Sequence, residues 1–191
     1  MWKYNGRTIR EGRAWTDDNG MQHPANWHVW SATEKAAAGL IEVTPETPPD
    51  SRLYTWGYLA DGVRISKTAK NLNDVNEVDG NGDPILDDDG NQLVTRGVKW
   101  NLKQEVKKQQ ADLLSQTDWA IVRKADNDTA VPANIQTWRN SIRTKATEME
   151  TAIDNAADTD AIADLFVTYT TNEDGSVTKS GVLYDWPELG N

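Results

Sequence analysis

The sequence contains no cysteine, which excludes disulfide bonds, zinc–thiolate sites and cysteine nucleophiles. It also lacks any apolar run approaching the length of a membrane span, and its first residues, MWKYNGRTIR, lack the apolar stretch of a secretory signal. Cations are scarce, with 20 Lys and Arg against 30 Asp and Glu, so the formal net charge is −10. Because this charge opposes binding to phosphate backbones and anionic lipids, we expect neither a nucleic-acid nor a membrane partner.

Apolar residues are few as well, at 37% of the chain, so we expect a modest core. Nine tryptophans partly offset this shortage, since each can anchor a small core or an interface. We predict that most of them are core residues and that a minority contact partners, because a thin core cannot enclose all nine. The predicted partner contacts lie in the N-terminal region and the C-terminal tail: Trp2, Trp15, Trp27, Trp30, Tyr184 and Trp186.

Catalytic and metal-binding motifs are missing. The chain has no G-x-S-x-G elbow and no phosphate-binding glycine loop, and its two histidines, His23 and His28, are poorly spaced for a metal. Residues 79–83 match the start of a calcium loop, D-x-N-x-D. However, Pro84 occupies the place of the turn glycine and Gly90 that of the bidentate glutamate. We therefore predict no enzymatic activity, no metal and no cofactor.

The order of the patterns predicts an α+β fold. It should contain a small β-hairpin-rich N-terminal region, an antiparallel helical pair and a C-terminal β-hairpin. We divide the chain into four segments: a Trp-rich module of strands and a short helix (1–43), a Pro-rich linker with an acidic β-hairpin region (44–97), a helical hairpin region (98–167), and a C-terminal β-hairpin with a tail (168–191).

Turn signals of the Asp-Gly and Asn-Gly kind punctuate the strands. One lies at residues 18–20, between predicted strands over 8–16 and 21–27. The unit strand–Asp/Asn-Gly–strand recurs along the chain, at residues 61–62, 79–82, 89–90 and 174–175. We expect these turns to close hairpins, and we expect the acidic hairpin in the middle of the chain to project.

Two long helices are predicted, over Val98–Ser115 and Pro132–Asn155, packed as an antiparallel pair. The second has a clear apolar stripe at helical spacing: Ile135, Trp138, Ile142, Ala146, Met149 and Ile153. Arg139 falls outside that stripe. Between the helices, residues 117–122 should form a short capped turn, and a third, short helix is expected over 159–167.

One segment, residues 23–43, carries a family resemblance. It combines Pro-x-Asn-Trp with a helix that opens in a capping box and ends before a glycine. This pattern resembles proteins encoded in the tail gene clusters of bacteriophages, including marine and cyanobacterial phages. The matching residues are Pro24, Asn26, Trp27, Ser31, Glu34, Lys35, Gly39 and Leu40.

A second segment, residues 113–144, is similar to parts of phage tail fibre assembly chaperones and related tail-associated proteins. It has a Leu-Leu-x-x-Thr-Asp-Trp run followed by a Pro-led helix with an aromatic-Arg-x-x-Ile-Arg signature. The matching residues are Leu113, Leu114, Thr117, Asp118, Trp119, Arg123, Pro132, Trp138, Arg139, Ile142 and Arg143. From the residues themselves, we expect Trp119 to wedge between two helices, and Arg139 and Arg143 to hold a carboxylate.

The resemblance implies a non-enzymatic component of a phage tail that contacts fibre or baseplate proteins. Such a protein would be present in several copies in a symmetric assembly. It would be located in the virion tail, and in the host cytoplasm during assembly. Two alternatives stay open at this point. One is a tail fibre assembly chaperone, and the other is a carbohydrate-binding receptor module that uses aromatic faces.

Overall fold

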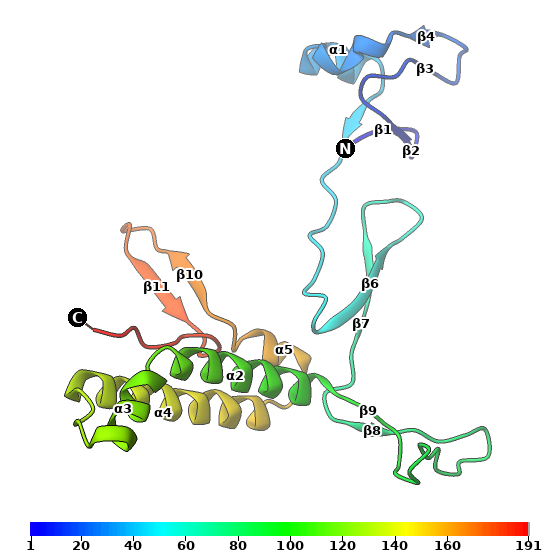
Figure 1. The fold of residues 1–191 in the computed structure, drawn as a ribbon. Coiled ribbons are helices and arrows are strands. Elements are labelled where there is room, and N and C mark those ends of the chain that lie inside the picture. The colour runs from blue at the N-terminus through cyan, green and yellow to red at the C-terminus, as the bar shows by residue number, and fades with distance from the viewer. Residues whose placement is uncertain (191) are drawn as a thin grey trace. The chain divides into compact units, whose positions relative to one another are not determined.

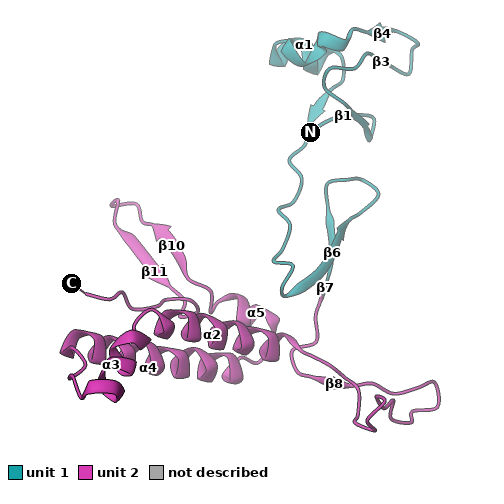
Figure 2. Cartoon of the chain, in the orientation of Figure 1, with its two compact units in different colours: residues 1–68 teal, residues 69–191 magenta. Residues whose placement is uncertain are grey.

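The computed structural model describes residues 1–190, and its helices and small antiparallel sheets confirm the α+β class (Figure 1). The chain forms two compact units, Met1–Thr68 and Ala69–Asn191 (Figure 2). We call them unit 1 and unit 2. This division is coarser than the four predicted segments, and it splits the predicted 44–97 segment between the units.

Unit 1 begins with a tight hairpin that the sequence analysis did not identify. Strands β1 (Trp2–Tyr4) and β2 (Arg7–Ile9) pair antiparallel, and β5 (Ile41–Glu42) pairs with the other side of β1. The turn residues Asn5 and Gly6 both have positive φ, as a two-residue hairpin of this type requires. The predicted strand over 8–16 is therefore divided, because its first residues pair with β1 instead of 21–27.

The second hairpin of unit 1 does form at the predicted turn. It joins β3 (Trp15–Thr16) to β4 (Gln22–His23) and leads into a 3₁₀ helix, η1 (Ala25–Val29). The short helix α1 (Ala32–Ala37) follows, with the predicted capping box between Ser31 and Glu34. After α1, Gly39 takes a φ of +73°, which only glycine adopts easily. Strands β6 (Tyr54–Tyr58) and β7 (Ile65–Ala69) complete the unit.

The core of unit 1 is largely aromatic. Its buried cluster is Ile9, Trp15, Trp27 and Leu40, against which Trp2, Tyr4, Trp30 and Ala38 pack. Trp27 has no exposed surface, and its indole N–H donates to the carbonyl oxygen of Arg13 at 3.0 Å. The ring of Trp2 meets that of Trp27 edge-on, with centroids 6.2 Å apart. Large rings thus provide the burial that strands of two or three residues cannot.

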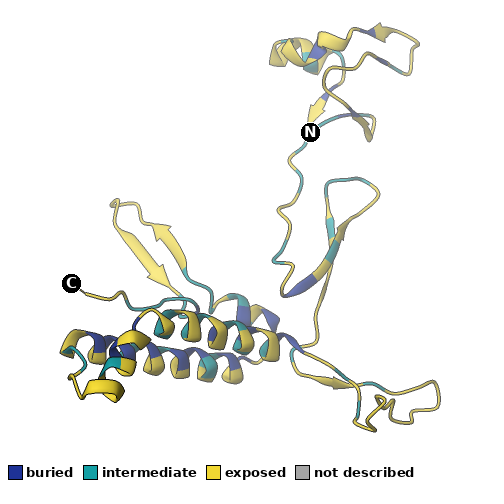
Figure 3. Cartoon of the chain, viewed as in Figure 1, coloured by how far each residue is buried: buried dark blue, intermediate teal, exposed yellow. Residues whose placement is uncertain are grey.

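Unit 2 is built on the predicted helical pair. Helices α2 (Val98–Ser115) and α4 (Ala133–Asn155) pack along their lengths, and Pro132 is the N-cap of α4. All six residues of the predicted α4 stripe are buried. They face Val98, Leu102 and Val106 of α2, so the buried surface follows the inner sides of the two helices (Figure 3). The short helix α5 (Thr159–Ala163) adds Ile162 to this core.

Three predictions about the corner between α2 and α4 are wrong. The predicted turn over 117–122 is a full helix, α3 (Asp118–Asn127). Trp119 does not wedge between helices, because its side chain is 52% exposed and lies against the guanidinium of Arg123. Conversely Arg139, expected outside the buried stripe, is only 6% exposed because it bonds the corner itself.

Two further hairpins belong to unit 2. Strands β8 (Val75–Asn76) and β9 (Val94–Thr95) open an excursion that we call the acidic arm, residues 74–96. The strand predicted within the arm is reduced to single bridges, such as that between Leu86 and Gln92. Strands β10 (Thr168–Thr171) and β11 (Val177–Ser180) form the predicted C-terminal hairpin, which is exposed on both faces (Figure 3).

Candidate partner-binding surfaces

One loop design closes several of the hairpins. It spans five residues and is led by aspartate at residues 17–21, 79–83 and 87–91, and by asparagine at 172–176. The backbone N–H of the first residue donates to the carbonyl of the fifth at 2.8–3.0 Å, and the fourth residue is a glycine with positive φ. The predicted recurrence of turn signals is therefore a repeated structural unit.

In the aspartate-led loops, the leading carboxylate also accepts backbone N–H bonds from the third and fifth residues. For Asp79 these bonds measure 2.8 Å from Asn81 and 3.0 Å from Asp83. They hold the pKa of Asp79 below its usual value, and the bond from Asn91 does the same for the pKa of Asp87. The carboxylates are thus occupied in shaping the turns. Within residues 1–190, no cluster of His, Asp and Glu could hold a metal ion.

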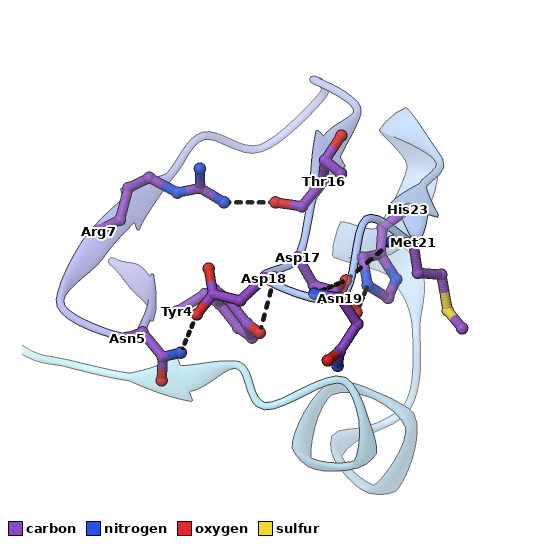
Figure 4. A network of polar contacts seen from close by, with 9 residues as sticks. All are labelled: Tyr4, Asn5, Arg7, Thr16, Asp17, Asp18, Asn19, Met21 and His23. Carbon is purple, nitrogen blue, oxygen red and sulfur yellow. Dashed lines mark hydrogen bonds and ion pairs between the residues drawn. The ribbon is translucent and has the colours of Figure 1, made fainter.

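Figure 4 shows how the first of these loops is tied to the neighbouring hairpin. The hydroxyl of Tyr4 accepts the backbone N–H of Asp18 at 3.2 Å, and the Asn5 amide donates to the Asp18 carboxylate at 2.5 Å. Asp17 accepts from Met21 and lies 3.3 Å from His23, and these contacts lower its pKa. The two turns of unit 1 are therefore fixed to each other by side chains.

Two of the four predicted N-terminal partner contacts are core residues. Trp27 is fully buried and Trp15 is only 8% exposed, with the His23 ring stacked on it at 4.1 Å. Their rings therefore have almost no surface to offer a partner, which corrects the expectation for these two residues. Trp2 and Trp30 are half-buried at the border of the cluster and keep part of their rings accessible.

The predicted C-terminal contacts are engaged within the chain. The Tyr184 hydroxyl donates to Glu105 and the Trp186 indole N–H to Gln109, each at 2.7 Å, one turn apart on α2. The Trp138 indole N–H of α4 donates to the carbonyl of Pro187 at 2.8 Å. The tail therefore crosses both helices. The Trp186 ring stays half-exposed, so its predicted partner contact stays a prediction.

The residues of the second motif, within residues 113–144, have structural positions. Arg139 donates to the carbonyl of Leu114 at 2.6 Å and to the Thr117 hydroxyl at 2.8 Å, and it lies 2.9 Å from the Asp118 carboxylate. Arg143 donates to the backbone of Arg139 rather than to a carboxylate. The structure thus brings the two halves of the second motif together at one corner.

The first motif is also structural. Pro24 is the N-cap of η1, Trp27 fills the unit 1 core, and Gly39 ends α1 against the ring of Tyr4. Asn26 is exposed. Neither motif assembles acids, bases and nucleophiles in a cavity, so its residues support the fold of each unit.

Further exposed apolar residues lie on elements of unit 2 for which no partner contact was predicted. The α3 helix exposes Trp119, Ile121 and Val122, and the C-terminal hairpin exposes Tyr169 and Val177. The acidic arm exposes a further set: Val75, Val78, Ile85, Leu86 and Leu93. In the acidic arm and the C-terminal hairpin these apolar residues lie near turn glycines, but the sequence alone could not distinguish a buried face from an exposed one.

Comparisons with known proteins give no counterpart: no family model matches the chain, and no curated protein and no solved structure matches it either. Among residues 1–190, no helix combines the length and the apolar character that crossing a membrane requires.

Proposed function

We propose that the protein is a non-enzymatic, tail-associated structural protein of a bacteriophage virion, which joins fibre or baseplate proteins. The observation that carries the proposal is the set of exposed apolar residues on three separate elements of unit 2. These elements are α3, the acidic arm and the C-terminal hairpin. A protein that binds at several points needs such projecting contacts more than it needs a deep pocket.

The acidic arm and the C-terminal hairpin are expected to have little stability without a partner. An isolated two-stranded hairpin is marginal in water, and every residue of β10 and β11 is exposed. Partner chains that cover these strands would bury Tyr169 and Val177 and pair their open edges. This requirement supports a role inside an assembly.

The assignment to a phage tail rests on the two resembling segments, residues 23–43 and 113–144. In the structure, residues of these two segments support the folds of two different units. In the proposed role the protein is present in several copies in the tail and passes through the host cytoplasm during assembly.

Quantitative mass spectrometry of purified virions tests the proposal. We expect the protein in intact particles at a fixed ratio to other tail proteins, retained after a high-salt wash. A tail fibre assembly chaperone would be abundant in the lysate and missing from the particles, and that result would contradict the structural role. A glycan array probed with the purified chain tests the second alternative, a carbohydrate-binding module, for which we expect no binding.

A further inference from the structure

A basic hollow on unit 1 stands out in an acidic protein. It has a volume of about 420 Å³ and is lined by residues 7–10 and 13–16, including Arg7, Arg10 and Arg13. All three arginines are exposed. Unit 1 as a whole carries eight Lys and Arg and eight Asp and Glu, so three of its eight cations gather at this one place.

The three guanidinium groups are available to different degrees. Arg7 reaches across to the carbonyl oxygen of Thr16 at 2.5 Å (Figure 4). Within residues 1–190, no hydrogen bond or ion pair engages the side chains of Arg10 and Arg13. Their backbones are fixed, since the N–H of Arg13 donates to the carbonyl of Arg10 and the Arg13 carbonyl accepts the Trp27 indole N–H. A turn anchored to the core therefore presents two unpaired cations.

The wall of the hollow contains an unused donor. Trp15 lines the hollow, is more than nine-tenths buried, and its indole N–H has no hydrogen-bond partner. A buried polar group without a partner is unfavourable and rare in folded proteins. Trp15 therefore brings a donor without an acceptor to the lining of the hollow.

Strand edges border the same hollow. β2 is the outer strand of the sheet β2–β1–β5, and β3 pairs on one side only, with β4. No strand in the described part of the chain pairs with the remaining edge of either. An unpaired strand edge offers backbone donors and acceptors to an extended peptide, whereas a small inorganic anion has no use for it.

We propose that this hollow binds an extended acidic peptide segment of a partner protein. Backbone groups of the peptide pair with the open edge of β2, because the Thr16 carbonyl of β3 already accepts from Arg7. The carboxylates of the peptide meet Arg10 and Arg13. Arginine suits the task because its planar fork binds a carboxylate with two parallel hydrogen bonds. The inference rests on the proposed function only in expecting a protein partner. The protein could be found in virions by mass spectrometry even if this hollow binds no peptide.

The test is fluorescence anisotropy with the full-length protein and a labelled, blocked peptide of alternating Val and Asp. The matched probe replaces every Asp with Asn. We expect saturable binding of the Asp peptide that weakens as salt rises from about 50 to about 300 mM, and no binding of the Asn peptide. Equal affinity for the two peptides would overturn the proposal.

Two double variants locate the site. Arg10→Ala with Arg13→Ala should raise the Kd of the Asp peptide about tenfold or more. Arg52→Ala with Arg64→Ala removes the same charge elsewhere in unit 1 and should change the Kd by less than about twofold. Equal losses in both would mean general attraction and would contradict a site. Far-UV circular dichroism should show both variants folded, since all four side chains are exposed.

The remaining experiments distinguish an extended acidic peptide from other ligands. A Val-Asp peptide N-methylated on alternate residues should bind more weakly, because it cannot pair with a strand edge, and unchanged affinity would overturn the strand-pairing geometry. Inorganic phosphate and a sulfated oligosaccharide serve as competitors. If either binds the hollow while the Asp peptide does not, the site receives a non-protein anion and the proposal is wrong.

Discussion

The two units differ in their charge and in the residues that form their cores. Unit 1 balances its charges, with eight cations and eight anions, whereas unit 2 has twelve against twenty-two and so carries the whole net charge of −10. Of the six buried hydrophobic residues in unit 1, three are aromatic: Trp15, Trp27 and Tyr54. Of the thirteen in unit 2, only Trp138 is.

The contrast follows from element length. The strands of unit 1 have two to five residues, so few positions face inward and each must bury a large group. The helices α2 and α4 have 18 and 23 residues and spread burial over many aliphatic side chains. Unit 1 should therefore depend on single residues more than unit 2 does.

The largest expected effect is that of Trp27→Ala in unit 1. Losing this fully buried ring should cost about 3–5 kcal/mol, which approaches the whole stability of a unit this small. Hydrogen exchange followed by mass spectrometry should show unit 1 unprotected while α2 and α4 stay protected. Val29→Ala is the control, because that side chain is exposed. Equal loss of protection in both units would remove the distinction between them.

Trp138→Ala tests the other side of the comparison. The transfer and cavity cost is again about 3–5 kcal/mol, but the rest of the α4 stripe should keep unit 2 folded at room temperature. We expect a lower Tm in calorimetry, with the helical signal intact below the transition. The matched Trp119→Ala variant should leave the Tm nearly unchanged, since Trp119 is exposed. An unaltered Tm for Trp138→Ala would show that the stripe is not the core.

Arg139→Ala should have the next largest effect. It removes the hydrogen bonds from the guanidinium to the Leu114 carbonyl and the Thr117 hydroxyl at a buried corner, at a cost of roughly 2–4 kcal/mol. Urea denaturation of unit 2 provides the measurement. Arg143→Ala removes an exposed guanidinium and should cost far less. If the two variants are equally stable, the corner does not depend on Arg139.

Trp186→Phe measures how firmly the tail is held. It removes one indole N–H bond to Gln109 and keeps most of the ring, so we expect a loss of about 1 kcal/mol. Limited proteolysis should then cut the tail faster than in the wild type. Leu189→Ala, an exposed change in the same tail, is the control. Identical cleavage rates in the Phe variant and the wild type would mean that the tail is held by other contacts.

Lowering the pH should destabilise the aspartate-led loops of both units, with a smaller effect than the substitutions above. The folded-state pKa of Asp17, Asp79 and Asp87 lies below the unfolded value. The stabilisation is therefore complete at neutral pH and is lost as the pH falls below about 4 toward the folded-state pKa. Amide exchange at Asn81 and Asn91 should accelerate in that range. Asp79→Asn should remove most of the pH dependence at the first of these amides, and an unchanged profile would contradict the assignment.

The sequence predicted the features that depend on local or strongly periodic signals. The α4 stripe, the Ser31 capping box and the helix end at Gly39 need only neighbours within a turn or two. The β1–β2 hairpin was missed although Asn5-Gly6 is a strong turn signal, because residues 8–16 were assigned to the next hairpin.

Other features required tertiary information. Arg139 looks like a surface residue by spacing, and only the return of α4 past Leu114 makes it buried. The contacts of the tail join residues more than seventy positions apart, from Tyr184 to Glu105 and from Trp186 to Gln109, which no local pattern predicts. The basic hollow depends on two short strands meeting at one place, which no single segment encodes.

Cross-linking of purified virions tests the central claim most directly. A carboxyl-reactive reagent suits the acidic arm, which carries no lysine or arginine between residues 74 and 95. We predict cross-links from the arm, and from Glu173 or Asp174 in the C-terminal hairpin, to at least one other virion protein. Particles that lack the protein, or that yield cross-links only within its own chain, would contradict a role in joining tail components.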